Sequence, residues 1–159
     1  MSALLTQKAG MSSAEPASDL QQYAALPWRI DRDGFLEVLL VTSRRRGRWT
    51  VPKGWQMKQR SGSQSAETEA FEEAGVVGRI DDKPIGSFRY SKRRDDGTFD
   101  PCFVTIFGLH VQGTLHSWPE KSQRKRRWMK IAQACEVAGE PTLAAFLGTL
   151  KPTSAECRS

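Results

Sequence analysis

One helix pattern set among β-like segments restricts the fold of this chain more than any other feature. Residues 65–74 are rich in Ala and Glu and contain no Pro or Gly, a composition that favours an α-helix. Ser63 is the predicted N-cap, and Gly75 stands where a left-handed glycine commonly ends a helix. A second helix is predicted over 141–150, because its large apolar residues recur on one helical face.

β-like segments lie on both sides of the first helix. Residues 35–42 form a nearly continuous aliphatic run, as in a strand that is buried on both faces. Residues 31–34 predict a hairpin turn before it, and residues 26–30 predict an edge strand, because Pro27 cannot donate to a ladder. Strands that alternate with helices predict a mixed α/β domain. Further strands are predicted at 49–51, 76–80, 85–90, 103–111 and 126–129.

Length and composition restrict the class of protein. A chain of 159 residues suits one domain. No run approaches the roughly 20 apolar residues of a membrane span, so no membrane partner is expected. The 3 cysteines are far apart, which disfavours a disulfide scaffold and favours a reducing, cytoplasmic location. Residues 1–19 and 152–159 are poor in large apolar groups and predict a flexible arm and tail around a domain at 20–151.

The charge balance points to an anionic ligand. The chain carries 24 Lys and Arg against 18 Asp and Glu, a net charge of +6. Dense basic runs occur at 44–46, 92–94 and 124–127, in predicted loops or strand edges. Each run is equally consistent with a solvated surface. A nucleic acid is a disfavoured partner, because the aromatic residues do not interleave with the basic runs as stacking platforms would.

Three carboxylates gather on one face of the predicted helix. Glu69, Glu72 and Glu73 are related by three and four residues and therefore lie close together. Crowded carboxylates repel one another unless a cation neutralises them, and Mg²⁺ or Mn²⁺ prefers carboxylate oxygen. Taken alone, the triplet also suits a solvated acidic helix face.

The surrounding pattern favours the metal site, because residues 54–76 resemble the Nudix box. With Gly54 on the first glycine of that motif, the positions expected for conserved acidic, glycine and aliphatic residues are filled by Glu69, Glu72, Glu73, Gly75 and Val76. The resemblance implies a Nudix fold, an α/β fold in which a mixed β-sheet is sandwiched between α-helices. It also implies that Gly54, Glu69, Glu72 and Glu73 bind Mg²⁺ or Mn²⁺. Glu69 or Glu73 would activate the attacking water; Glu120, outside the box, is a further candidate.

Two positions depart from the motif. Arg60 stands where the family has its first Glu, and Thr68 stands where it has the Arg that orients the catalytic Glu. Without an arginine at position 68, the motif itself fixes the side-chain orientation of Glu69 less well. These departures leave open an alternative, a Nudix-fold module that binds a phosphorylated ligand with weak or no catalysis.

The substrate implied by the resemblance is a multiply charged small molecule. Lys53, Lys58 and Arg60 flank the implied metal site and are expected to contact a polyphosphate, with Arg48 and Arg89 as further contacts. The chain resembles the branch of diphosphoinositol polyphosphate and diadenosine polyphosphate phosphohydrolases. The resemblance implies a Nudix pyrophosphohydrolase that cleaves a phosphoanhydride bond in such a substrate. The inositol-phosphate enzymes have a basic group just after an N-terminal tyrosine, whereas Tyr23 is followed here by Ala24, Ala25 and Leu26. This difference favours a dinucleoside polyphosphate as the substrate.

Overall fold

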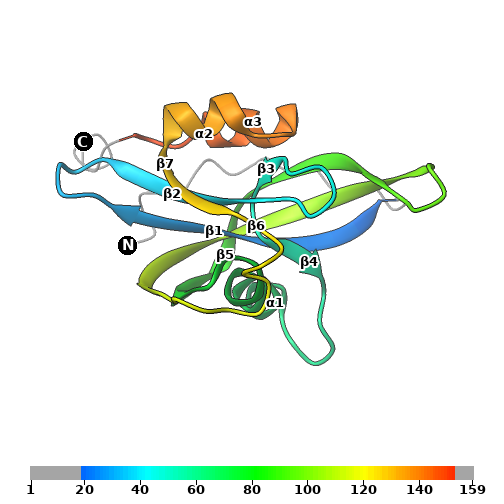
Figure 1. Ribbon diagram of the computed structural model, residues 1–159, viewed down its shortest axis with the longest axis horizontal. Coiled ribbons are helices and arrows are strands. Elements are labelled where there is room, and N and C mark those ends of the chain that lie inside the picture. Colours follow the sequence, from blue (N-terminus) through cyan, green and yellow to red (C-terminus); the bar gives the residue numbers. More distant parts are fainter. Residues whose placement is uncertain (1–18, 153–159) are drawn as a thin grey trace.

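The centre of the computed structural model, which describes residues 19–152, is a mixed β-sheet (Figure 1). The predicted arm and tail lie outside the described residues, apart from Asp19 and Pro152. The strands are β1 (Leu20–Ile30), β2 (Leu36–Thr42), β3 (Trp49–Thr50), β4 (Lys53–Trp55), β5 (Val76–Arg93), β6 (Phe99–Thr114) and β7 (Arg126–Lys130). The helices are α1 (Gly62–Glu69), its continuation η2 (Ala70–Ala74), α2 (Ile131–Val137) and α3 (Pro141–Leu147).

The sheet places five strands in the order β3-β2-β1-β6-β5, with β4 paired to β1 and β7 paired to β2. β1 and β6 run parallel, whereas the other ladders of the described residues are antiparallel. Parallel strands need a long crossover, and the chain between β1 and β6 supplies one that contains α1. The predicted mixed α/β fold is therefore confirmed.

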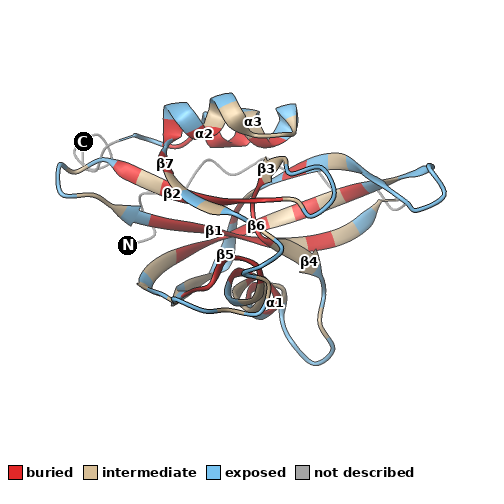
Figure 2. Ribbon diagram, in the orientation of Figure 1, coloured by how far each residue is buried: buried red, intermediate tan, exposed pale blue. Residues whose placement is uncertain are grey.

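Helices cover both faces of the sheet. α2 and α3 lie on one face, and α1 with η2 lies on the other (Figure 1). β2 is buried along almost its whole length, as predicted (Figure 2). Its Leu36, Val38 and Leu40 belong to the core beside α2 and α3, whereas Leu39 and Val41 belong to the core beside α1. An aliphatic run without polar alternation is the expected result of two covered faces.

β1 is a central strand, so the prediction of an edge strand at residues 26–30 is wrong. β6 pairs with β1 from Leu20 to Trp28, and β4 and β2 share its other side. On that side the ladder to β4 ends at Ala24 and the ladder to β2 begins at Trp28. Pro27 falls in the gap between these two ladders, where a missing N–H breaks no hydrogen bond.

The helix that carries the acidic triplet begins earlier than predicted. Ser61, not Ser63, is the N-cap: its hydroxyl accepts from the Gln64 backbone N–H, and the Gln64 side chain accepts from the Ser61 N–H. The last turn, η2, is a π-helix rather than an α-helix. Gly75 ends it in the left-handed conformation, with φ 67°, as predicted.

The remaining differences concern the extent of elements. The segments 76–80 and 85–90 belong to one bent strand, β5, whose ladder with β6 carries register shifts. α2 was not predicted, because only two of its residues, Ile131 and Ala134, are buried and its apolar periodicity is correspondingly short. α3 ends at Leu147 rather than at residue 150. Between residues 19 and 152, no helix is both long enough and apolar enough to cross a membrane.

Candidate active site

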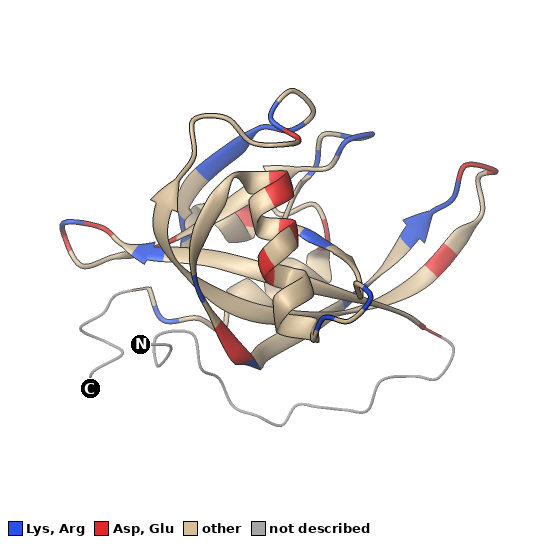
Figure 3. Ribbon diagram, turned by 90° about the horizontal axis from the view of Figure 1, so that it is seen from below, with Lys and Arg blue, Asp and Glu red and all other residues tan. Residues whose placement is uncertain are grey.

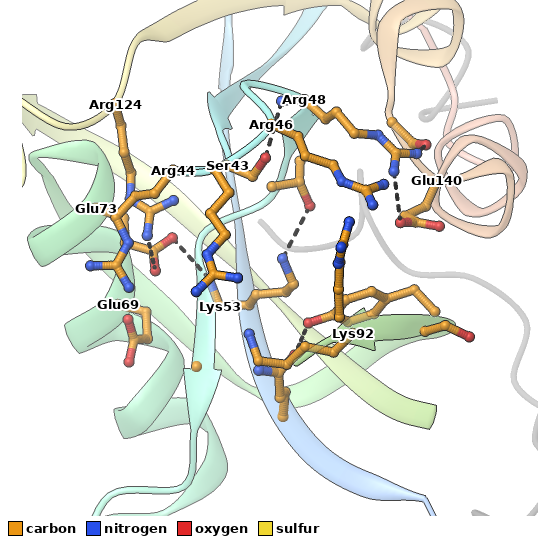
Figure 4. Close-up of a pocket in the computed structure, with 18 of the residues that line it drawn as sticks. Ser43, Arg44, Arg46, Arg48, Lys53, Glu69, Glu73, Lys92, Arg124 and Glu140 are labelled. Carbon is orange, nitrogen blue, oxygen red and sulfur yellow. Dashed lines mark hydrogen bonds and ion pairs between the residues drawn. The ribbon is translucent and has the colours of Figure 1, made fainter. Parts of the chain in front are cut away.

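A cavity of about 970 Å³ opens beside the acidic helix and is lined by many charged residues of both signs (Figure 4). One end is lined by Glu69, Glu72, Glu73 and Glu120. The other end is lined by the basic loop 44–46 and by the basic end of β5. Figure 3 shows acidic residues along the α1–η2 helix, and both basic and acidic residues in the loops and strands around it. The tertiary structure therefore collects charges that are scattered along the sequence.

The acidic end is closely packed around Gly54. A Cβ atom at Gly54 would overlap the carboxylate of Glu69, so the glycine leaves room for that carboxylate beside β4. The Glu69 carboxyl is close enough to Glu73 for the negative charge of Glu73 to raise the pKa of Glu69. Glu69, Glu72 and Glu73 all line the same cavity as Gly54.

Glu73 is the most firmly held of the helix carboxylates. Its side chain is only 9% exposed. The backbone N–H of Lys53 donates to its Oε1 at 3.3 Å, and the guanidinium of Arg124 contacts its Oε2 at 3.2 Å. Both carboxylate oxygens therefore already have a donor from the protein.

A loop that precedes β7 braces the end of the helix. Trp118 Nε1 donates to the backbone oxygen of Glu73 at 3.2 Å, and the Glu120 N–H donates to that of Glu72 at 3.0 Å. Arg126 donates to the carbonyl of Ala74 at 2.9 Å and stacks over the Trp118 ring. These bonds satisfy helix carbonyls that have no partner inside the helix, so the loop fixes the turn that carries Glu72 and Glu73.

Burial and charge crowding shift the ionisation of this site. Burial, followed by repulsion from Glu73 and Glu72, raises the pKa of Glu69 to about 8. Burial also raises the pKa of Glu73, although the positive charges of Arg124 and Lys53 oppose the shift. The pKa of Lys53 is lowered by its burial. Shifted groups of both signs in one cavity are typical of a functional site.

The donor set at the acidic end fits a hard divalent cation. No three Asp, Glu, His or Cys side chains within residues 19–152 converge as a ready-made metal cluster, so the predicted triad is not a compact three-carboxylate site. Mg²⁺, however, is usually held by one or two carboxylates together with waters and substrate phosphates. Glu69 and Glu73, packed against Gly54, supply such a set, with Glu72 adjacent.

The basic end comes from two segments that lie far apart in the sequence. The loop between β2 and β3 contributes Arg44, Arg45 and Arg46, and the end of β5 contributes Lys92, Arg93 and Arg94. Arg45 pairs with Asp95, and Arg94 pairs with Asp100. Arg46, Lys92 and Arg93 form no ion pair with an acidic residue of the described part of the chain. Their charge is available to an anionic ligand.

The structure brings some of the predicted substrate contacts to the cavity and not others. Lys53 lies in the middle of the cavity, with Nζ 3.5 Å from the hydroxyl of Thr50 (Figure 4). Arg48 also lines the cavity, but its guanidinium is engaged by the carbonyl of Gly139 and by Glu140 at 3.7 Å. It ties the β3 strand to the segment before α3.

Lys58, Arg60 and Arg89 do not line the cavity, which corrects the sequence prediction for these three. Lys58 is exposed, and Arg60 donates to the hydroxyl of Thr68 at 2.6 Å. Arg89 lies between the cavity-lining residues of β5 and pairs with Asp19 at 3.3 Å. Successive strand side chains point to opposite faces, so Arg89 turns away from the cavity.

Arg124 contacts Glu73 and Glu120 in the structure, but in the sequence it is marked only as one residue of a basic run. Arg124 is 51 residues from Glu73, and no local pattern connects the two. Tyr90 was also missed: it lines the cavity and donates to the Gln22 side chain at 2.7 Å.

Known proteins share this sequence pattern and fold. No family model matches the chain. It is 34% identical over 111 residues to Nudix hydrolase 12 of Arabidopsis thaliana, which covers 68% of this chain and 55% of that protein. The chain thus spans about half the length of this curated relative. It is 32% identical over 142 residues to diphosphoinositol polyphosphate phosphohydrolase 3-beta of Bos taurus, which covers 86% of this chain and 81% of that protein.

A solved structure gives the same fold. The C. elegans Ap4A hydrolase has a TM-score of 0.61 and 19% sequence identity, and the match covers 82% of this chain and 95% of that chain. This chain combines the shared fold with Gly54 on β4 and with Glu69 and Glu73 on the α1–η2 helix. The chain belongs to the Nudix hydrolase family.

Proposed function

We propose that this chain hydrolyses a phosphoanhydride bond in a multiply charged small molecule, such as a dinucleoside polyphosphate or a diphosphoinositol polyphosphate. One observation carries the proposal: a single cavity joins a packed carboxylate pair, Glu69 and Glu73, to a basic lining. The carboxylates suit divalent metal ions and the cations suit phosphates. The similarity to a relative that is named as a diphosphoinositol polyphosphate phosphohydrolase supports the substrate class.

Nudix hydrolases generally use divalent metal ions. Glu69 and Glu73, with Gly54 and the adjacent Glu72, are the residues that would hold Mg²⁺ or Mn²⁺. When bound, such an ion neutralises phosphate charge and lowers the pKa of water. The chain itself must then orient the polyphosphate, hold its negative charge and accept a proton from the attacking water.

The residues of the cavity divide these tasks. Lys53 and the basic lining bind the phosphate chain. The two oxygens of Glu73 already accept hydrogen bonds from Lys53 and Arg124, which fix the orientation of its carboxylate. We therefore assign Glu73 to holding the metal rather than to accepting a proton. Glu69 and Glu120 remain as proton acceptors, because both line the cavity and Arg124 contacts only one of the two carboxylate oxygens of Glu120.

The test is a panel of phosphoanhydrides incubated with Mg²⁺ or Mn²⁺, with identification of the products. Dinucleoside polyphosphates and diphosphoinositol polyphosphates are both included. Glu73→Gln should lower the rate about 10–100-fold or more, since it removes a metal ligand. Glu67→Gln removes a charge from the same helix outside the cavity and is the matched control.

Equal rates for the wild type and Glu73→Gln would contradict the role assigned to Glu73. Tight binding of a polyphosphate with no turnover across the panel would favour the alternative, a phospho-ligand binding module. A cytoplasmic location stays a proposal as well, and microscopy of the tagged full chain tests it.

A further inference from the structure

Arg124 is an almost fully buried cation at the acidic end of the cavity. Its side chain is 9% exposed. It contacts Glu73 Oε2 at 3.2 Å and Glu120 Oε1 at 2.7 Å, and it donates to the backbone oxygen of Thr42 at 3.1 Å. One guanidinium therefore joins the catalytic helix, the loop before β7 and the end of β2.

The contacts of Arg124 fix the orientation of the carboxylates that it pairs with, in addition to balancing their charge. A guanidinium is planar and presents its donors in a fixed fork, so contacts at three acceptors determine its position. Glu73 then has one oxygen fixed by Arg124 and the other by the Lys53 N–H. Neither carboxylate that pairs with Arg124 can rotate without breaking a buried charged hydrogen bond.

The α1–η2 helix itself contains no basic residue near its carboxylates that could orient them. Position 68, which precedes Glu69, is Thr, and its hydroxyl bonds to Arg60 and to the Gln64 carbonyl. No basic residue follows in the last turn of the helix. A cation from outside the helix is therefore the group that orients its carboxylates.

We propose that Arg124 is a positioning residue that holds the metal ligand Glu73 and the cavity carboxylate Glu120 in their working orientations. The proposal rests on the proposed hydrolysis for its kinetic consequence. Its structural consequence is independent of turnover, because the Lys53 N–H bonds to Glu73 and reports the orientation of that carboxylate.

The experiment compares Arg124→Gln, Arg124→Lys and the full-length wild type. Lys125→Gln is the matched control: it removes one positive charge from the next residue, whose side chain is exposed and outside the cavity. Amide NMR spectra record the proton shift of Lys53 in each protein without substrate. Steady-state kinetics and calorimetry with a methylene-bridged diadenosine polyphosphate are measured in parallel.

Arg124→Gln should displace the Lys53 amide signal and lower kcat about 10–100-fold, with KM and analogue binding changed far less. Arg124→Lys should recover part of both effects, and Lys125→Gln should resemble the wild type. The Lys125→Gln control and the Lys53 signal together exclude a general effect of lost charge.

Two results would overturn the proposal. An unchanged Lys53 signal in a folded Arg124→Gln protein would show that Arg124 does not hold Glu73. An unchanged kcat with a raised KM and weakened analogue binding would show that Arg124 contacts substrate instead. If the wild type hydrolyses nothing in the panel, the proposed function fails, whereas the Lys53 signal still decides the positioning role. If Arg124→Gln does not fold, the Lys53 signal and the kcat of Arg124→Lys provide the comparison with the wild type.

Discussion

The guanidinium of Arg60 donates a hydrogen bond of 2.6 Å to the hydroxyl of Thr68. These are the two positions at which the chain departs from the Nudix box, and they contact each other. The departures are therefore one coupled exchange rather than two separate losses. An arginine restored at position 68 would stand beside the Arg60 side chain.

Thr68→Arg alone should not raise activity and should lower thermal stability. It would place two guanidinium groups side by side, and like charges at this separation repel. Arg60→Glu combined with Thr68→Arg should recover stability, because it makes an opposite-charge pair worth about 0.5 kcal/mol at an exposed site. Thermal melts of both variants and of Arg60→Glu, combined as a double-mutant cycle, measure the coupling. If the two substitutions change stability additively, the contact between residues 60 and 68 contributes no coupling free energy.

Gly54→Ala should abolish most activity while the protein stays folded. A Cβ atom at this position would overlap the Glu69 carboxylate and push it away from Glu73. The expected loss is about 10–100-fold in the rate of polyphosphate hydrolysis, as for other changes that disturb metal ligands. Gly113→Ala is the control, because a Cβ there meets Val77 Cγ2 at an ordinary 3.4 Å. Full activity in Gly54→Ala would contradict the close packing at the site.

Removing the unpaired cations of the cavity should weaken substrate binding more than catalysis. In the triple variant Arg46→Gln, Lys92→Gln and Arg93→Gln, the KM for a polyphosphate should rise at least about tenfold, with a smaller change in kcat. The dependence of KM on salt should also become shallower, since fewer charges remain to be screened.

A charge-matched variant controls for the change in net charge. Lys58, Lys83 and Lys125 are exposed and lie outside the cavity, so replacing all three by Gln removes the same charge elsewhere. If both triple variants raise KM equally, the effect is a general one of net charge and the cavity lining has no specific role.

Ser61→Ala should destabilise the protein by about 1 kcal/mol. It removes the hydroxyl that accepts from the Gln64 N–H at the start of the α1–η2 helix. Ser63→Ala should cost less, because the Ser63 hydroxyl contacts only Ser61 Oγ, at 3.2 Å, among the bonds of the described residues. Urea titrations of both variants compare their free energies of unfolding. A larger loss in Ser63→Ala than in Ser61→Ala would indicate that Ser63 is the N-cap.

Stability should fall as the pH drops through the ordinary pKa of histidine because of His110. Its ring stacks on Trp28 at 4.3 Å, and its Nδ1 is buried without a hydrogen-bond partner in the described residues. Burial lowers the pKa of His110 below its ordinary value of 6.5. The unfolded chain therefore binds the proton more readily, and acid favours unfolding. Melting temperatures between pH 8 and pH 5 should decline less in His110→Gln; parallel curves would contradict this.

The sequence by itself determined the elements whose local pattern is strong. The aliphatic run of β2, the turn at 31–34 and the glycine that ends the catalytic helix follow from short-range sterics and periodicity. The acidic residues of the site could be found for the same reason, because Glu69, Glu72 and Glu73 lie on one helical turn.

Tertiary structure decided which strand is central and which cations reach the carboxylates. Pro27 marks an edge by local rules, yet β1 is central because two separate strands share one of its sides. Arg60 lies within the box in sequence but donates to Thr68, whereas Arg124 reaches Glu73 from 51 residues away in the sequence. Sequence spacing fixes neighbours within one helix or strand. Contacts between elements depend instead on the strand order and on the course of the loops, and no local sequence pattern predicts either.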